Sequence, residues 1–263
     1  MTSSGVEHIT SRDNALLKDL RKLATDPTAY RTQARIWVEG EHLCRAAMLR
    51  GVTALLGIFS ESGWPLMAAE FAPGARKNIV IPDRLFERIS PMESPAKMGF
   101  VMALAPTPAF QGDRASVILE RVQDAGNVGA ILRSASAFGF GQIIALEGTA
   151  ALWSPKVLRA GMGAHWGLQV AEAVALGDLA RLALPIVVTS SHQGLFLHQA
   201  LREGQLPWPC AWAFGHEGRG VSNELQGLAT RCVRIAQPGG EESLNVAAAA
   251  AICLHASATM ALS

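Results

Sequence analysis

The sequence predicts two α/β domains joined by a short linker. Before residue 105, β-like runs (RIWVEG, VTALLGIF, NIVI and GFVMALA) alternate with helical ones (EHLCRAAMLR and PDRLFERI), which indicates a small α/β unit. Residues 105–113, APTPAFQGD, hold two prolines and a glycine and show no apolar period, as is typical of a linker. We therefore expect one domain over residues 1–106 and a second over 112–263.

Beyond the linker, strand and helix patterns alternate regularly. The apolar runs SVILERV, QIIAL, PIVVT, AWAF and VRI predict strands, and helices are expected at 127–138, from Pro155, around Leu197, at 222–228 and at the carboxy terminus. Strands separated by helices indicate a mostly parallel sheet covered on both faces. Such sheets bind ligands in the loops at the carboxyl ends of their strands.

A basic amphipathic helix is expected near the amino terminus. Leucines recur at helical spacing between Asp13 and Leu23. The other faces of this helix carry four cations: Arg12, Lys18, Arg21 and Lys22. These cations could form a binding surface for an anionic partner, or they could only solubilise the helix.

Composition excludes several classes of protein. With 263 residues, 49% hydrophobic and 17% charged, the chain can bury a large core, so disorder is excluded as its main state. The net charge of +1 predicts no global cationic field. The four cysteines form no Cys-x-x-Cys pair, which argues against a zinc site and a disulfide framework and favours a reducing cytoplasm.

Neither export nor membrane insertion is expected. The amino terminus, MTSSGVEHITSRDN, lacks the apolar segment of a secretory signal. The one uncharged stretch, residues 244–262, is mostly alanine interrupted by Asn245, His255 and hydroxyl residues. It is interpreted as a close-packed helix of a soluble protein with no membrane partner.

Three strand-to-helix loops carry the polar residues that could do chemistry. The first, LERVQDAGNVGAILRSASAFG, places Asn127 in a turn and Arg133 on the following helix. The second, AFGHEGRGVSNEL, surrounds Glu217 with three glycines, which would let a ligand approach the backbone. The third, QPGGEESLNVAAAAA, opens a helix with Glu241, Glu242, Ser243 and Asn245. Each loop alone could equally be a structural turn or a capped helix; their order and spacing together favour a site.

These three loops resemble, in order, the signature motifs of the SpoU family of the SPOUT superfamily, the TrmH-like RNA ribose methyltransferases. DAGNVG through Arg133 is similar to motif one, GHEGRG (215–220) to motif two and SLNV (243–246) to motif three. The first half is similar to the family's RNA-binding extension through SRDNALLKDLRKL and VEGEHLCRAAMLRG. Ala125 and Ala236 stand where the family usually has proline, which affects loop rigidity and not reactive groups.

The resemblance implies a fold, a cofactor and partners. The fold is a small RNA-binding α/β domain followed by a SPOUT domain with a parallel sheet and a carboxy-terminal trefoil knot. The knot holds S-adenosylmethionine, and a homodimer interface lies beside the active site. The implied catalytic residues are Asn127, Arg133, Glu217, Ser243 and Asn245. The implied cofactor contacts are Gly215, Gly220, Ile235 and Leu244, mainly through their backbones, with Thr189 as a weaker candidate.

The implied reaction is transfer of a methyl group to a ribose 2′-hydroxyl of structured RNA, with ribosomal RNA favoured over transfer RNA. Because arginine stays protonated, Arg133 is assigned to stabilising the developing alkoxide and gripping the adjacent phosphate. Glu217 is expected to orient Arg133 or Asn127. RNA binding is expected at Arg12, Lys18, Arg21, Lys22 and Arg133.

Three other functions compete with ribose methylation. Base methylation by the same superfamily and a non-catalytic knotted RNA-binding protein both remain open. A Rossmann-type enzyme is rejected, because the glycines of FGFGQ follow a helix and precede a strand, the reverse of a dinucleotide fingerprint.

Overall fold

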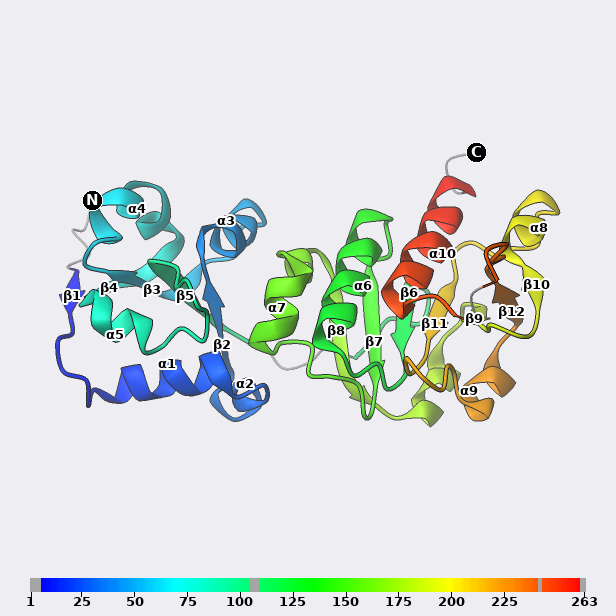
Figure 1. Cartoon of the computed structure of the whole chain (residues 1–263), viewed down its shortest axis with the longest axis horizontal. Coiled ribbons are helices and arrows are strands. Elements are labelled where there is room, and N and C mark those ends of the chain that lie inside the picture. Colours follow the sequence, from blue (N-terminus) through cyan, green and yellow to red (C-terminus); the bar gives the residue numbers. More distant parts are fainter. Residues whose placement is uncertain (1–5, 105–108, 241–242, 261–263) are drawn as a thin grey trace. The chain divides into compact units, whose positions relative to one another are not determined.

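The computed structural model describes residues 6–104, 109–240 and 243–260, and the chain divides into two compact units (Figure 1). Unit 1 is formed by the chain up to residue 106 together with residues 153–166. Unit 2 is formed by residues 107–152 and by the chain from 167 onward. Residues 153–166, which the sequence pattern predicts to be part of the second domain, group with unit 1 by their contacts. Part of the expected linker, residues 105–108, lies outside the described residues.

Unit 1 contains a mixed sheet whose described strands run in the order β1-β4-β3-β5-β2. Strands β3 and β4 are parallel, and β5 is antiparallel to both β2 and β3. Its strands are β1 (Glu7–His8), β2 (Arg35–Glu39), β3 (Ala54–Ser60), β4 (Ala75–Ile81) and β5 (Met98–Ala103). Its helices are α1 (Ala15–Thr25), α2 (Ala29–Gln33), α3 (Glu41–Leu49), α4 (Trp64–Phe71), the 3₁₀ turn η1 (Ala72–Gly74) and α5 (Asp83–Glu87).

The first helix forms because its leucines share one face and its start is capped. Asn14 is the N-cap, and its side chain accepts a hydrogen bond from Leu16 N at 2.9 Å. Leu17, Leu20 and Leu23 are buried, while Lys18, Arg21 and Lys22 are exposed. The helix expected from Asp13 to Leu23 therefore exists, shifted by two residues because the cap stands at Asn14.

Unit 2 contains a parallel sheet whose described strands run in the order β10-β12-β9-β11-β6-β7-β8. This confirms the parallel sheet expected from the sequence. The strands are β6 (Ser116–Leu119), β7 (Gln142–Leu146), β8 (Gln169–Val174), β9 (Ile186–Thr189), β10 (Leu195–Phe196), β11 (Ala211–Phe214) and β12 (Arg231–Arg234). Strands β8 and β10, at the two sheet edges, were not among the predicted strands.

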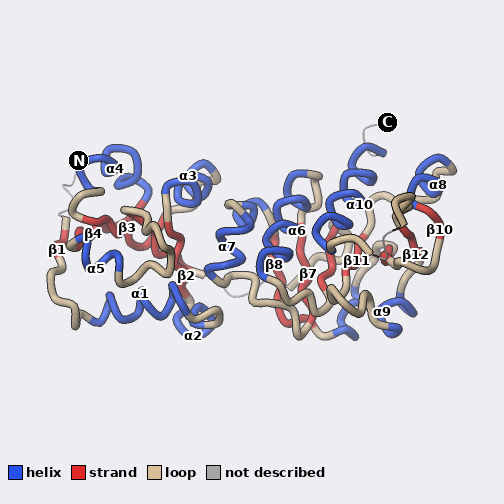
Figure 2. The backbone as a smooth tube through the Cα atoms, in the orientation of Figure 1, coloured by secondary structure: helices blue, strands red, loops and turns tan. Residues whose placement is uncertain are grey.

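Most helices of unit 2 connect successive strands of its sheet, and α10 follows the last strand. The helices are α6 (Ala125–Ala137), η3 (Leu176–Arg181), α8 (Leu197–Arg202), α9 (Asn223–Leu228) and α10 (Val246–Met260). Helix α7 (Pro155–Gly161) lies in the segment grouped with unit 1, and η2 (Ala164–Gly167) follows it. Helices α6 and α10 lie side by side (Figure 2). Among the described residues, no helix combines the length and apolar character needed to cross a bilayer.

The alanines of α10 allow it to pack closely on the sheet. Ala250, Cys253 and Ser257 are buried, and the Trp212 indole of β11 donates a hydrogen bond to Ser257 Oγ at 2.8 Å. The central strands β6, β7 and β11 are buried throughout, as expected of a sheet covered on both faces. Because the paired strands are parallel, the loops after β6, β9, β11 and β12 all begin at the same edge of the sheet.

Candidate functional site

A cavity of about 520 Å³ opens at this edge of the unit 2 sheet. It is lined by three segments, which follow β9, β11 and β12. Its volume lies in the range that binds small organic ligands. All five residues expected to contact the cofactor line it: Thr189, Gly215, Gly220, Ile235 and Leu244.

The glycines of the loop 215–221, here called the glycine loop, serve the loop's own closure. A Cβ added at Gly215 would lie 2.1 Å from the carbonyl carbon of Gly220, so only glycine fits there. Gly220 has a φ of +65° and donates its N–H to His216 O at 2.8 Å. The glycines are expected from the sequence to let a ligand approach the backbone, whereas at Gly215 the nearest atoms belong to the opposite end of the same loop.

A chain of side-chain hydrogen bonds joins the three sequence motifs. Asn127, in the first turn of α6, donates from Nδ2 to Glu217 Oε1 at 3.2 Å. Asn245, before α10, donates from Nδ2 to Asn127 Oδ1 at 2.9 Å. Residues that lie about 90 to 118 positions apart in sequence are thereby held together at one place.

The direction of every bond in this chain follows from its two ends. A carboxylate can only accept hydrogen bonds, so Asn127 must turn its NH₂ toward Glu217 and its carbonyl toward Asn245. At the other end, Asn245 Oδ1 accepts from the backbone N–H groups of Ala247 and Ala248 at 2.9 and 3.2 Å and caps α10. Its NH₂ is therefore directed at Asn127. Both amide orientations are fixed by chemistry.

Glu217 also organises the turn that begins α6. Its carboxylate accepts from Asp124 N at 3.1 Å and from Gln123 N at 3.3 Å. Burial acts to raise the pKa of Glu217, but hydrogen bonds from backbone N–H groups and from Asn127 outweigh it and leave the pKa below its ordinary value. Glu217 is therefore ionised near neutral pH and is a poor proton acceptor.

Arg133 does not take part in this chain of hydrogen bonds. Arg133 is exposed on α6, and within the described part of the molecule it forms no hydrogen bond or ion pair. Glu217 contacts Asn127, which was one of the two partners expected for it. Ser243 is exposed and lines the cavity, whereas Glu241 and Glu242 lie outside the described residues.

The four cations expected on the first helix differ in their surroundings: Arg12 precedes α1, whereas Lys18, Arg21 and Lys22 lie on it. Arg12 lies 3.7 Å from the Asp13 carboxylate, and Arg21 Nε donates to Arg88 O at 3.1 Å. Lys18 and Lys22 are exposed on the same helix. The two lysines are therefore the better candidates for contact with an anionic partner.

Several polar residues that line the cavity were not predicted. His192 and Gln193 follow β9, and Asn223 and Gln226 belong to α9. The available signal was the position of His192 and Gln193 just after a predicted strand, where a parallel sheet places its ligand loops, and that of Asn223 and Gln226 on the helix after the second motif. In the described ranges, no group of three or more His, Cys, Asp or Glu side chains could hold a metal ion.

The sequence matches the SpoU rRNA Methylase family over residues 114–255. The chain belongs to this family. It is thus an RNA methyltransferase that uses S-adenosylmethionine.

Relatives match over nearly the whole chain. A Synechocystis protein described as an uncharacterized tRNA/rRNA methyltransferase is 31% identical over 96% of this chain and 94% of its own length. The Bacillus subtilis 23S rRNA (guanosine(2553)-2′-O)-methyltransferase RlmP is 28% identical over 95% and 98%. In fold, the chain is similar to an AdoMet-bound rRNA methyltransferase from Sinorhizobium meliloti, with a TM-score of 0.82 and 24% identity over 98% and 99%.

The cavity lining fits S-adenosylmethionine chemically. Thr189, Asn223 and Gln226 supply hydrogen-bonding groups that suit a ribose and an adenine edge. Ile235 and Leu244 supply apolar surface that suits the face of a purine. A mixed lining of this kind is what a nucleoside cofactor requires.

Replacing Asn245 by aspartate should separate its two roles. In Asn245→Asp the carboxylate still accepts from Ala247 and Ala248, so α10 keeps its cap, but it cannot donate to Asn127 Oδ1. We expect an unchanged melting temperature and a loss of methyl transfer of about 10-fold or more, measured by label incorporation into RNA. Asn245→Ala is the control, because it removes both roles and should also lower stability by about 1 kcal/mol. Full activity in Asn245→Asp would show that the link to Asn127 is dispensable.

Proposed function

We propose that this protein transfers the methyl group of S-adenosylmethionine to a ribose 2′-hydroxyl of ribosomal RNA. The observation that carries the proposal is the hydrogen-bonded chain Glu217–Asn127–Asn245, which joins the three motifs beside the cavity. The name of the B. subtilis relative, a 2′-O-methyltransferase of 23S rRNA, supports ribose over base and ribosomal over transfer RNA. Base methylation and RNA binding without catalysis are the competing functions.

The cavity is proposed to hold the cofactor through Thr189, Gly215, Gly220, Ile235 and Leu244. When bound, S-adenosylmethionine supplies an electrophilic methyl group on a sulfonium. The protein's task is then to align a hydroxyl with that methyl group and to stabilise the charge that develops on oxygen. Ser243, which lines the cavity, is proposed to help orient the target nucleotide.

Arg133 is proposed to face the RNA. Its guanidinium stays protonated and can donate to a phosphate and to a developing alkoxide, but it cannot remove a proton. Its exposure on α6 leaves its donors available to a substrate. Asn127 lies in the first turn of the same helix, so α6 connects the hydrogen-bonded residues Glu217, Asn127 and Asn245 to Arg133.

Unit 1 is proposed to add an electrostatic RNA surface through α1. Its exposed cations Lys18 and Lys22 can contact phosphates without breaking an internal bond. Arg21 and Arg12 are proposed as weaker contributors, because each already has a partner in the protein.

The homodimer is proposed to use the exposed apolar groups of unit 2. Ile252, on α10, is 41% exposed, and Leu244, just before that helix, is 39% exposed. Apolar side chains of this size are stabilised by burial in an interface. The trefoil knot and the cytoplasmic location stay predictions; the described cysteines are all free thiols, which suits a reducing compartment.

Incubation with S-adenosylmethionine labelled in its methyl group tests the proposed reaction. Purified ribosomal and transfer RNA, free of the modification, are offered separately and then digested to nucleosides. We expect a labelled 2′-O-methyl nucleoside from ribosomal RNA. A labelled base would establish the base-methylating alternative, and cofactor and RNA binding without label transfer would establish the non-catalytic one.

Arg133→Ala should abolish transfer and leave cofactor affinity nearly unchanged. The reason is that Arg133 does not line the cavity. Loss of one donor to a developing oxyanion costs about 100-fold or more in rate. Calorimetric titration with S-adenosylmethionine and single-turnover transfer rates measure the two effects. Arg159→Ala, which removes another cation, is the control and should affect neither as strongly. Loss of cofactor binding in a folded Arg133→Ala protein would place this residue on the cofactor side.

The salt dependence of RNA binding should be reduced by reversing Lys18 and Lys22. Each phosphate contact contributes roughly 0.7 to 0.9 to the slope of log affinity against log salt concentration. Lys18→Glu/Lys22→Glu should therefore flatten the slope by about 1.4 to 1.8 if both residues touch phosphate. Arg50→Glu/Arg76→Glu changes the net charge equally at exposed positions outside α1 and is the matched control. Equal slopes for both double variants would mean that α1 does not bind RNA.

A further inference from the structure

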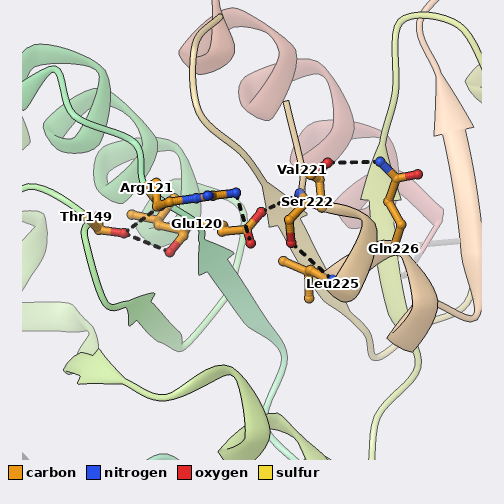
Figure 3. A network of polar contacts seen from close by, with 8 residues as sticks. Glu120, Arg121, Thr149, Val221, Ser222, Leu225 and Gln226 are labelled. Atoms are coloured by element: carbon orange, nitrogen blue, oxygen red, sulfur yellow. Dashed lines mark hydrogen bonds and ion pairs between the residues drawn. The ribbon is translucent and has the colours of Figure 1, made fainter. Parts of the chain in front are cut away.

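Both ends of the glycine loop are held by one residue, Glu120, which directly follows β6. The backbone N–H of Glu120 donates to Phe214 O at 2.9 Å, at the point where β11 enters the loop. Its side-chain Oε2 accepts from Ser222 N at 2.6 Å, where the loop leaves for α9. Figure 3 shows the Glu120 side chain directed at Ser222. One residue thus contacts the chain immediately before and immediately after residues 215–221.

Glu120 is buried, which makes its hydrogen bonds necessary. Its exposed fraction is 5%, and its second carboxylate oxygen lies 3.5 Å from Arg121 Nη2. A buried carboxylate without partners would carry a large desolvation penalty. A charge-assisted bond to a backbone N–H is correspondingly strong. The hydrogen bond from Ser222 N to Glu120 therefore holds the end of the glycine loop in place.

The turn that aims this carboxylate is itself held in an unfavourable conformation. Arg121 has a φ of +56°, in the left-handed region that residues with a Cβ rarely occupy. Thr149 Oγ1 accepts from Arg121 N at 3.1 Å and donates to Leu119 O at 2.9 Å, so it ties the backbone on both sides of Glu120 (Figure 3). Such a conformation persists only where surrounding contacts hold it, and here Thr149 holds the turn from which the Glu120 carboxylate reaches Ser222 N.

The loop's exit is reinforced on the α9 side. Ser222 Oγ accepts from Leu225 N at 3.2 Å and caps the helix. Gln226 Nε2 donates to Val221 O at 2.9 Å. Gln226, Val221 and Glu217 all line the cavity, whereas Glu120 does not. Displacement of the Ser222 anchor would therefore move groups that form the cavity wall.

We propose that Glu120 is a positioning residue, which sets the shape of the cofactor cavity by holding both ends of the glycine loop. It acts through Ser222 and Phe214 and makes no contact with the cofactor. The inference rests on the proposed assignment of this cavity to S-adenosylmethionine. It adds a residue outside the cavity lining to those on which cofactor affinity depends.

Three variants of Glu120 test the proposal in the full-length protein. Glu120→Ala removes the acceptor, and we expect the Kd for S-adenosylmethionine to rise about 10- to 100-fold. Glu120→Asp keeps the charge but shortens the side chain, so it should also weaken binding. Glu120→Gln keeps an oxygen that can accept from Ser222 N and loses only the charge assistance of that bond and the weak pair with partly exposed Arg121, so its Kd should rise clearly less than that of Glu120→Ala.

Ser116→Ala is the matched control for a merely structural effect. Ser116 is fully buried at the other end of β6 and bonds to Gln142 Nε2 at 2.8 Å, remote in the strand from the glycine loop. This variant should lower the melting temperature and leave the Kd unchanged. Binding is measured by calorimetry well below each variant's melting temperature.

The outcomes separate this inference from the proposed function. A raised Kd in Glu120→Ala or Glu120→Asp with rescue by Glu120→Gln supports the positioning role. A lowered melting temperature with wild-type Kd in Glu120→Ala overturns it, as does an equally raised Kd in Glu120→Gln. If Glu120→Ala does not fold, Glu120→Asp against Glu120→Gln decides. If wild type binds S-adenosylmethionine but methylates no RNA, the proposed function fails while the comparison of Kd values still tests Glu120.

Discussion

A carboxylate has no hydrogen to donate, and the arrangement of the three motifs depends on that constraint. Glu217 accepts from two backbone N–H groups and from the Asn127 amide, which fixes the orientation of Asn127. Asn127 then requires a donor at its carbonyl, and Asn245 supplies it while capping α10. The starts of α6 and α10 and the glycine loop are thereby held at one point. Helices α6 and α10 pack side by side, so these hydrogen bonds join the starts of two helices that are already neighbours in the fold.

The parallel sheet allows the three motifs to converge with short loops. Every strand that precedes a motif ends at the same edge, so loops distant in sequence need only short extensions to meet. Two buried contacts at the carboxyl ends of these strands hold the glycine loop. One is the backbone pairing of β6 with β11, and the other is the hydrogen bond from Ser222 N to the Glu120 side chain. The loop closes on itself so tightly that Gly215 leaves no room for a Cβ. Its shape is therefore set by internal contacts before any ligand binds.

The sequence predicts the sheet and the meeting of the motifs, but not the details that depend on side-chain direction. Apolar runs identify the buried strands because burial on both faces demands them. Strand β10 spans only Leu195–Phe196, too short for a periodic signal. Segment 153–166 has an ordinary helix pattern, and only its tertiary contacts show that it groups with unit 1.

The position of Arg133 is another detail that depends on side-chain direction and that the sequence alone does not predict. Six residues along an α-helix turn the side chain by about 600°, which leaves Arg133 about 120° around α6 from Asn127. In the structure Asn127 contacts Glu217, whereas Arg133 does not. Sequence spacing predicts that the two residues lie on different sides of one helix, but only the folded structure shows which of them meets Glu217 and which is exposed. The separate positions agree with separate roles for the two residues.

In the proposed reaction a ribose hydroxyl loses its proton, and the charges and hydrogen bonds of the motif residues limit which group could accept it. Glu217 is unsuited to accept it, because its hydrogen bonds lower its pKa and occupy its oxygens. Arg133 is unsuited because a guanidinium group carries hydrogen-bond donors and no acceptor. Asn127 and Asn245 are amides, whose carbonyl oxygens are already engaged. The motif residues are thus equipped to hold, orient and stabilise charge. In the proposed ribose methylation, the protein would therefore contribute mainly by aligning the hydroxyl with the methyl group and by stabilising the alkoxide, and the proton would pass to a group other than Glu217, Asn127, Asn245 and Arg133.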